Sequence, residues 1–331
     1  MSKDKIEVLA MGNAIVDMTA IVTDEFLTEH DVTKGIMHLV DSEKSNEIYK
    51  NIDVSNVSAG GSAANTIYSL AKLGVSSGFI GKISEDELGG MFEDSIKGVG
   101  VEYKTKPVSQ DKEVSTSKCM VLITPDSERT MCTYLGASGH ITAFDVDEEM
   151  IAKSEITYLE GYLFDGDETK KAFKMVADIA HKGGKKIALS LSDPFCVERH
   201  HKDLAEFIEK YVDILFCNEE EIKALCKSED LPKTMPHCSL VIITRGDKGV
   251  VIISKDEYVE VPADTDVEVI DLNGAGDGFA AGFLYGYVKE LPLKTCGEIG
   301  VAIASEVIST VGARPETDLT QLLINKNNLI G

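Results

Sequence analysis

The sequence predicts a doubly wound α/β fold, in which helices cover both faces of a mostly parallel sheet, with a small β-sheet lid beside it. In the second half of the chain, short apolar segments alternate with amphipathic helical segments, which is the pattern of repeated strand–helix units. The apolar segments are rich in β-branched residues without polar alternation, as expected for parallel strands buried on both faces. Two stretches, Asp17 to about Val40 and Ser115 to Leu135, interrupt this pattern with strand-like segments that lack crossover helices.

The expected strands and helices follow one another closely along the second half. Strands are predicted at residues 156–160, 186–191, 212–216 and 240–243. Amphipathic helices are predicted at residues 168–181, 202–210 and 219–226. In open α/β sheets, ligands bind beyond the carboxyl ends of the strands. In this sequence those ends carry Asn13, Gly161, Ser192, Asn218 and Thr244.

The interrupting stretches predict a lid that is discontinuous in sequence. Residues 116–124 and 129–135 read as strands on either side of a Pro-Asp-Ser turn, which indicates a hairpin. The lid is expected to comprise residues 16–57 and 115–135. The large α/β nucleotide-binding domain is expected to comprise residues 1–15, 58–114 and 136–331.

The charge balance excludes some classes of partner. The chain has 33 Lys and Arg against 56 Asp and Glu, so its formal net charge is −23. Nucleic-acid binding needs a basic face that releases counterions, and an anionic membrane surface would repel this chain. ATP binding stays compatible, because amide donors and Mg²⁺ can set the field inside a cleft. We expect a small-molecule acceptor as partner, no nucleic acid, no membrane, and a monomer or homodimer.

The cysteines indicate a reduced, cytoplasmic protein. There are seven, an odd number without a CxxC pair, and several lie in apolar strands such as the one ending at Cys217. Such cysteines behave as small buried hydrophobes. No signal peptide is expected, because the chain runs almost directly into a strand. The longest nearly apolar run, residues 279–288, is too short to span a bilayer.

The segment Asp271-Leu-Asn-Gly-Ala-Gly-Asp277 is the strongest chemical signal in the sequence. Its glycines permit a tight turn with converging N–H groups, and a helix is predicted to begin directly after it. This arrangement suits an anion hole for a transferring phosphoryl group, with Asp277 as the base for an acceptor hydroxyl. Taken alone, the segment is about equally compatible with an N-cap aspartate after a glycine turn.

Two further observations concern this region. The dinucleotide fingerprint GxGxxG is not met, and the segment lies far from the first strand, which argues against a Rossmann oxidoreductase. Gly278, Gly282 and Gly286 recur every four residues, so they form a smooth stripe on one face of the helix. We expect this stripe to allow close packing of the helix against the sheet.

Two segments predict an acceptor-binding region. Gly60 and Gly61 would let a ligand approach the backbone, and Asn65 offers both a donor and an acceptor. Asn13 and Asp17, at the end of the first strand, are spaced to hold vicinal hydroxyls of a sugar. Each segment alone is compatible with a plainer interpretation, a glycine-rich helix entry in the first case and an ordinary turn in the second.

Two strand ends predict a nucleotide-binding region. Asn218 and Glu221 have the spacing to position Mg²⁺ through water, although an N-cap followed by first-turn acids accounts better for this segment alone. The glycines of Thr244-Arg-Gly-Asp-Lys-Gly249 would let the backbone and Thr244 approach a nucleotide. A hairpin turn is the alternative for that segment.

Taken together, and in their order along the chain, these segments resemble the ribokinase-like (PfkB) carbohydrate kinase family over nearly the whole chain. The matching motifs are GNxxxD at Gly12–Asp17, GGxxxN at Gly60–Asn65, NxxE at Asn218–Glu221, TxGxxG at Thr244–Gly249 and DxNGAGD at Asp271–Asp277. The resemblance implies a three-layer α/β/α sandwich with a β lid. It also implies an ATP-dependent phosphotransferase that uses Mg²⁺, with K⁺ as a further candidate cation.

The resemblance assigns roles residue by residue. Residues implied to act in catalysis are Asp277, Gly274, Ala275, Gly276 and the lid residue Arg129, which would screen phosphate charge. Residues implied to bind the nucleotide are Asn218, Glu221, Thr244, Gly246 and Gly249, the first two also supporting Mg²⁺. Residues implied to bind the acceptor are Asn13, Asp17, Gly61, Asn65, Met37, Leu135, Tyr162 and Phe195.

Within the family, the chain is most similar to the adenosine kinases. Leu189–Phe195 is similar to their NLSAPF segment, and Tyr162 falls where they place a purine-stacking aromatic. Asp193 stands in place of a small residue, and Leu272 in place of a threonine. The implied reaction transfers the γ-phosphoryl group of ATP to the 5′-hydroxyl of adenosine and gives AMP. Two alternatives stay open: a sugar kinase of the ribokinase or fructokinase kind, and a nucleoside-binding protein without turnover.

Overall fold

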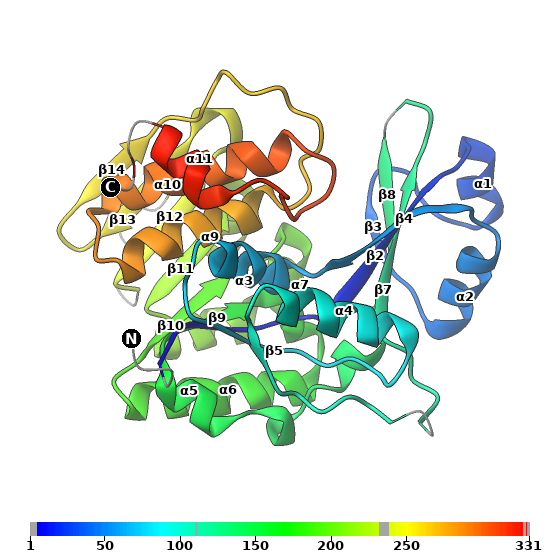
Figure 1. Ribbon diagram of the computed structural model, residues 1–331, viewed down its shortest axis with the longest axis horizontal. Coiled ribbons are helices and arrows are strands. Elements are labelled where there is room, and N and C mark those ends of the chain that lie inside the picture. The colour runs from blue at the N-terminus through cyan, green and yellow to red at the C-terminus, as the bar shows by residue number, and fades with distance from the viewer. Residues whose placement is uncertain (1–4, 110–111, 127, 232–237, 327–328, 330–331) are drawn as a thin grey trace.

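Two β-sheets organise the described part of the protein, a large one of nine strands and a small one of five (Figure 1). The computed structural model describes residues 5–109, 112–126, 128–231, 238–326 and 329. In spatial order the strands of the large sheet are β14 (Tyr258–Val261), β13 (Val250–Ser254), β12 (Leu240–Thr244), β11 (Ile214–Asn218), β10 (Lys186–Ser190), β9 (Ser154–Glu160), β1 (Ile6–Met11), β5 (Ser77–Ile80) and β6 (Glu102–Tyr103).

The large sheet is parallel from β12 to β6, and only β13 and β14 run antiparallel at one edge. The interior strands are fully covered. Leu9 and Ala10 of β1 both have no exposed surface, although their side chains point to opposite faces. The predicted α/β class with a mostly parallel sheet is therefore confirmed.

Helices cover both faces of the large sheet. One layer consists of α3 (Ser62–Lys72), α4 (Glu87–Gly98), α9 (Ala275–Val288) and α10 (Leu293–Ile308). The other layer consists of α5 (Glu148–Lys153), α6 (Asp167–Lys182), α7 (Pro194–Tyr211) and α8 (Glu219–Cys226). A last helix, α11 (Leu319–Asn325), packs outside the first layer through Leu319 and Leu323. Within the described ranges, every helix is too short or too polar to cross a membrane.

The small sheet stands to one side of the large one, at the right of Figure 1. Its strands, in spatial order, are β3 (Met37–Leu39), β8 (Arg129–Tyr134), β7 (Ser117–Ile123), β2 (Ile15–Ile21) and β4 (Val54–Gly60). The predicted hairpin is confirmed, because β7 and β8 pair antiparallel. One face buries Val16 and Met18 in the same core cluster as Leu27 of α1 (Asp24–Glu29) and Ile48 of α2 (Ser42–Lys50). The alternate residues Asp17 and Thr19 line a cavity.

Two expectations about helices were wrong in detail. Helix α7 begins at Pro194, eight residues before the predicted start, because Asp193 caps it by accepting a hydrogen bond from the Cys196 N–H at 2.7 Å. The glycine stripe of α9 packs against helix α10 and not against the sheet. A Cβ at Gly282 would lie 2.7 Å from the carbonyl oxygen of Ile299. The stripe therefore permits close contact between two helices of the same layer.

Candidate active site

A glycine turn sets the start of α9. Gly274 has a φ of +77°, and a Cβ at this position would lie 2.4 Å from the Cβ of Ala313. Both constraints require glycine. Because α9 begins at Ala275, the N–H groups of Gly276 and Asp277 have no acceptor within the helix. They are donors for an anion at the positive end of the helix dipole.

Asp277 lies in the first turn of α9, and its carboxylate faces α3. One oxygen accepts a hydrogen bond from Ser62 Oγ at 2.6 Å, and the other accepts one from Asn65 Nδ2 at 3.0 Å. Asp277 is not the helix N-cap, because Gly274 occupies that position. Burial raises the pKa of Asp277 to about 6, and the hydrogen bonds from Ser62 and Asn65 and the charge of Arg314 oppose the rise. Such a carboxylate is mostly ionised at neutral pH and can accept a proton.

The glycine pair before α3 brings the two predicted acceptor segments together. Gly61 has a φ of +94°, and a Cβ there would lie 2.2 Å from the carbonyl oxygen of Asn13. A Cβ at Gly60 would lie 2.2 Å from Oδ2 of Asp17. The Gly61 position therefore needs a residue without a side chain, and a Cβ at Gly60 would displace the Asp17 carboxylate. The start of α3, which carries Asn65, is thereby held against the ends of β1 and β2.

Glu160, which the sequence analysis did not single out, links these segments through hydrogen bonds. Its carboxylate accepts hydrogen bonds from Asn13 Nδ2 at 2.6 Å and from the Ala63 N–H at 2.9 Å. The side chain is buried at the end of β9. Burial raises the pKa of Glu160 to about 7, and these hydrogen bonds oppose the rise. Glu160 therefore fixes the amide of Asn13 and the backbone that follows the glycine pair.

A cavity of about 480 Å³ lies between the small sheet and two loops, one before α9 and one after α10. Asp17 and Arg129 line it from the small sheet, and Asp271, Asn273 and Arg314 line it from the loops. Burial raises the pKa of Asp17 to about 6, the charge of Arg314 opposes that rise, and Asp277 adds to it. Arg314 also donates a hydrogen bond to Asn65. The cavity is thus adjacent to the group of side chains that holds Asp277.

An ion pair links the small sheet to the segment that contains the glycine turn. Arg129 of β8 pairs with Asp271, whose side chain is only 3% exposed. Asp271 also accepts hydrogen bonds from the N–H groups of Asn273 and Gly312, each at 2.8 Å. It therefore shapes both loops beside the cavity. Arg129 lines the cavity, and in this structure it pairs with a carboxylate. Its predicted role in screening phosphate charge stays a prediction.

Comparison with known proteins shows the family to which the chain belongs. The family model described as "pfkB family carbohydrate kinase" matches residues 36–319. The chain belongs to that family. The predicted resemblance is confirmed, and the protein is a phosphotransferase with an alcohol group as acceptor.

Relatives and solved structures match this kinase over most of its length. Adenosine kinase 2 of Arabidopsis thaliana is 28% identical, over 92% of this chain and 94% of that protein. A structure of adenosine kinase from Sinorhizobium meliloti superimposes with a TM-score of 0.89 at 37% identity, covering 96% of this chain and 98% of the other. A probable sugar kinase from Rhizobium etli CFN 42 superimposes with a TM-score of 0.91 at 36% identity, covering 99% and 100% of the two chains.

The predicted nucleotide segments of the kinase lie on adjacent strands. Asn218 at the end of β11 pairs in register with Thr244 at the end of β12. Asn218 and Glu221 form a reciprocal capping box at the start of α8, in which Asn218 Oδ1 accepts from the Glu221 N–H at 2.8 Å. Gly246 and Gly249 have φ values of +57° and +83° in the turn between β12 and β13. The structure therefore brings these residues to one edge of the sheet, in the cap and the hairpin turn that the sequence left as alternatives.

The described residues contain no group of three or more His, Cys, Asp or Glu side chains that could hold a metal ion. Both carboxylate oxygens of Glu221 accept hydrogen bonds from Asn218, at 2.7 and 3.0 Å. Burial raises the pKa of Glu221 to about 7. This donor set fits a Mg²⁺ ion held mainly by substrate phosphates, with at most a water-bridged contact to the protein.

Of the eight residues predicted to bind the acceptor, only Asp17 lines the cavity. Tyr162 is mostly enclosed after β9, and its hydroxyl donates to the carbonyl oxygen of Ser192 at 3.3 Å. Phe195 is 66% exposed at the start of α7. Met37 of β3 and Leu135 after β8 are half-buried. Their assignment to the acceptor stays a prediction.

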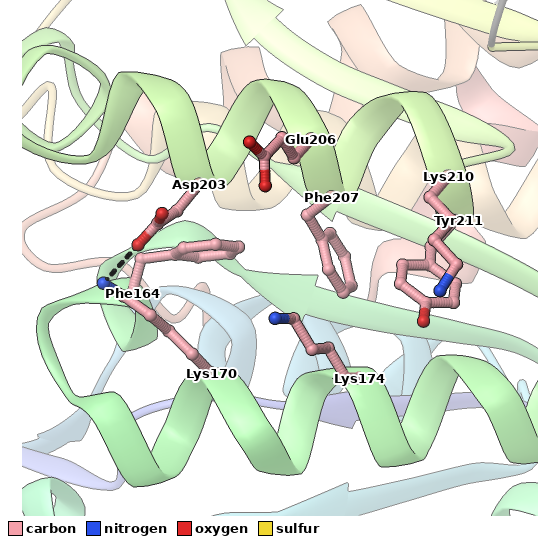
Figure 2. Close-up of a pocket in the computed structure, with 8 residues that line it drawn as sticks. All are labelled: Phe164, Lys170, Lys174, Asp203, Glu206, Phe207, Lys210 and Tyr211. Carbon is pink, nitrogen blue, oxygen red and sulfur yellow. Dashed lines mark hydrogen bonds and ion pairs between the residues drawn. The ribbon is translucent and has the colours of Figure 1, made fainter.

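A second cavity, of about 290 Å³, lies between α6 and α7 (Figure 2). Phe164, Phe207 and Tyr211 form its apolar part, and Lys170, which pairs with Asp203 at 2.6 Å, lies at its rim. The sequence-predicted site residues lie elsewhere. We therefore do not assign it to the kinase reaction.

Sequence reasoning missed three residues that hold the site together. Ser62 lies inside the quoted Gly60–Asn65 motif, and a hydroxyl one residue after a glycine pair is the signal that was available. Glu160 is a lone acid at the end of an apolar strand, which signals a buried partner. Arg314 lies in a loop between α10 and α11, and no motif in the single sequence marks it.

Proposed function

We propose that this kinase transfers the γ-phosphoryl group of ATP to the 5′-hydroxyl of adenosine, giving ADP and AMP, and so serves purine salvage. The observation that carries the proposal is the Asp277 carboxylate. It is partly buried, it is held by Ser62 and Asn65, and it follows a glycine turn that presents free N–H groups. A base and an anion site occur side by side where phosphoryl transfer needs both.

The proposed reaction balances with the residues available. The Asp277 carboxylate takes the proton of the acceptor hydroxyl as the oxygen attacks the γ-phosphorus. The bond from that phosphorus to the β,γ-bridging oxygen breaks, and ADP leaves. The N–H groups of Gly276 and Asp277 would stabilise the charge on the transferring group. A bound Mg²⁺ ion would neutralise phosphate charge. Asn218 and Glu221 are the residues that would contact it through water.

The small sheet is the proposed lid. We propose that residues 16–57 and 115–135 close over the acceptor, with residues 1–15, 58–114 and 136–331 as the large domain. Support comes from Asp17, which lies on the small sheet and lines the cavity, and from Arg129, which reaches Asp271 across it. When the nucleotide binds, Arg129 would exchange Asp271 for a phosphate oxygen.

The likeness to adenosine kinases from a plant, a yeast and a bacterium favours adenosine as the acceptor. Asn13, Asp17 and Asn65 supply the donors and acceptors that ribose hydroxyls need. A sugar kinase is the second candidate, favoured by the likeness to the probable sugar kinase of Rhizobium etli. We also infer a cytoplasmic location, because all seven cysteines are free thiols.

An acceptor screen tests the proposal. ADP release would be measured with Mg·ATP and, in turn, adenosine, other nucleosides, ribose and fructose. Adenosine should give the largest kcat/KM. Tyr162→Ala should weaken the binding of adenosine by about one to two powers of ten, because base stacking is worth about 1–3 kcal/mol. It should leave the binding of ribose unaffected. A sugar that outperforms adenosine, with Tyr162→Ala affecting both equally, would assign the protein to the sugar kinases.

A further inference from the structure

Arg314 makes several hydrogen bonds close to Asp277. Its Nε–H donates to Asn65 Oδ1 at 2.9 Å, and its two terminal nitrogens donate to Ser95 Oγ at 2.9 Å and to the carbonyl oxygen of Gly60 at 3.3 Å. The guanidinium lies over the ring of Tyr68, 4.9 Å from its centroid. Three acceptors and an aromatic ring fix a planar fork in one orientation.

This fork determines which way the amide of Asn65 faces. A guanidinium only donates, so the amide oxygen of Asn65 must face Arg314. The amide NH₂ must then face the other way, and there it donates to Asp277 at 3.0 Å. An ionised carboxylate only accepts, so both contacts agree with a single amide orientation. The chain of contacts runs from Arg314 through Asn65 to one oxygen of Asp277.

We propose that Arg314 is a positioning residue for phosphoryl transfer, which orients the Asp277 carboxylate by fixing the amide of Asn65. The inference rests on the proposed role of Asp277 as the base. Arg314 would touch neither the transferring phosphoryl group nor the attacking hydroxyl. It would hold the second oxygen of Asp277 so that the carboxylate is presented in one geometry, as preorganised catalysis requires.

The charge of Arg314 gives the second part of the role. Two partly buried carboxylates, Asp17 and Asp277, interact with it, and its positive charge lowers the pKa of both against the effect of burial. Without Arg314 the pKa of Asp277 would rise further, so a smaller fraction would be ionised at a given pH. The other titratable groups that interact with Asp277 or Arg314 are Glu160 and Tyr158 of β9 and Tyr68 of α3.

The test compares two substitutions at Arg314 through the pH profile of kcat/KM, measured by ADP release. Arg314→Gln should lower kcat about 10- to 100-fold at neutral pH, part of the roughly 10²–10⁴-fold that a general base supplies. It should also move the acid limb of the profile to higher pH. Arg314→Lys should restore the position of that limb, because the charge returns, while kcat recovers only in part. Arg199→Gln is the matched control, since Arg199 lies on the surface and pairs with Asp165.

A double-mutant cycle separates positioning from general damage. If Arg314 acts through Asn65, then Arg314→Gln should cost much less in the Asn65→Ala background than alone. Additive losses, an unchanged kcat and pH profile, or a loss confined to the KM of the acceptor would each overturn the proposal. Thermal unfolding would show whether Arg314→Gln folds, and if it does not, Arg314→Lys takes its place in the cycle.

The outcome for Asp277→Asn separates this inference from the proposed function. Near wild-type turnover of Asp277→Asn would refute the assignment of the base, and with it the proposed mechanism. An inactive Asp277→Asn beside a fully active Arg314→Gln would overturn the role of Arg314 alone.

Discussion

Two carboxylates, the partly buried one of Asp277 on the proposed acceptor side and the buried one of Glu221 on the proposed nucleotide side, receive their hydrogen bonds in opposite ways. Glu221 accepts from the backbone and the side chain of Asn218, three residues earlier. Asp277 accepts from Ser62 and Asn65, which lie 215 and 212 residues away along the chain. The first arrangement exists wherever the helix forms. The second exists only when the fold is assembled, so it can hold a reactive group in a geometry that no single helix specifies.

Charge separates the two carboxylates further. Burial raises the pKa of both, to about 6 for Asp277 and about 7 for Glu221. Arg314 opposes the rise at Asp277, whereas the nearby acids Asp193 and Glu220 add to it at Glu221. At neutral pH Asp277, which has the lower pKa of the two, is therefore mostly ionised, whereas Glu221 is about half protonated. This difference predicts that substitutions of Asp277 and of Glu221 will have effects of different size on activity.

Asp277→Asn should have the largest effect. It keeps the shape of the side chain and removes its ability to take a proton, so turnover should fall by about 10²–10⁴-fold. The measurement is kcat from ADP release, with circular dichroism and ATP binding as checks that the fold and the nucleotide site persist. A folded variant with near wild-type turnover would contradict the assignment.

Gly61→Ala should have a smaller effect, and Gly74→Ala is its matched control. Both glycines have positive φ, +94° and +78°, so each substitution should cost about 1–3 kcal/mol in the free energy of unfolding. A Cβ at Gly61 would in addition lie 2.2 Å from the carbonyl oxygen of Asn13, whereas one at Gly74 would meet nothing within 4 Å. Only Gly61→Ala should therefore displace Asn13 and α3, and lower kcat/KM by up to about 10²-fold.

Denaturant unfolding and ADP release together check this pair. Equal losses of activity in the two variants would mean that the close approach of Gly61 to Asn13 does not matter for the reaction.

Local signals in the sequence predicted the parts of the site that are built locally. The helix near Asp277, the glycine pair and the start of α8 depend on residues within a few positions of one another, so spacing and residue type suffice to predict them. The helix begins at Ala275, three residues before the predicted start. The strand runs likewise predicted a parallel sheet, because burial on both faces shows in composition.

Contacts between distant segments could not be predicted in this way. Arg314 and Asn65 are 249 residues apart, and Arg129 and Asp271 are 142 apart. The glycine stripe of α9 shows the same limit, because spacing defines one face of a helix and does not say which element covers it. Here a neighbouring helix covers it, and the sheet does not.

The smallest effect is expected for Glu221→Gln, and it tests whether the nucleotide side has a role beyond capping. If ionised Glu221 supports Mg²⁺ through water, the variant should need a few-fold more Mg²⁺ for half-maximal activity at pH 8. Because the pKa of Glu221 is raised to about 7, the wild-type side chain is mostly protonated at pH 6. The two proteins should then give the same Mg²⁺ titration at pH 6.

The control for this titration is Glu220→Gln, which removes an exposed acid from the same turn of α8. It removes one negative charge from the helix start without removing either side chain of the capping box. Identical Mg²⁺ curves for all three proteins at pH 8 would make Glu221 a structural cap and leave the metal to the phosphates of ATP. A shift for Glu221→Gln alone, lost at pH 6, would show that a locally satisfied carboxylate also serves the substrate, and would narrow the contrast between the two sides of the site.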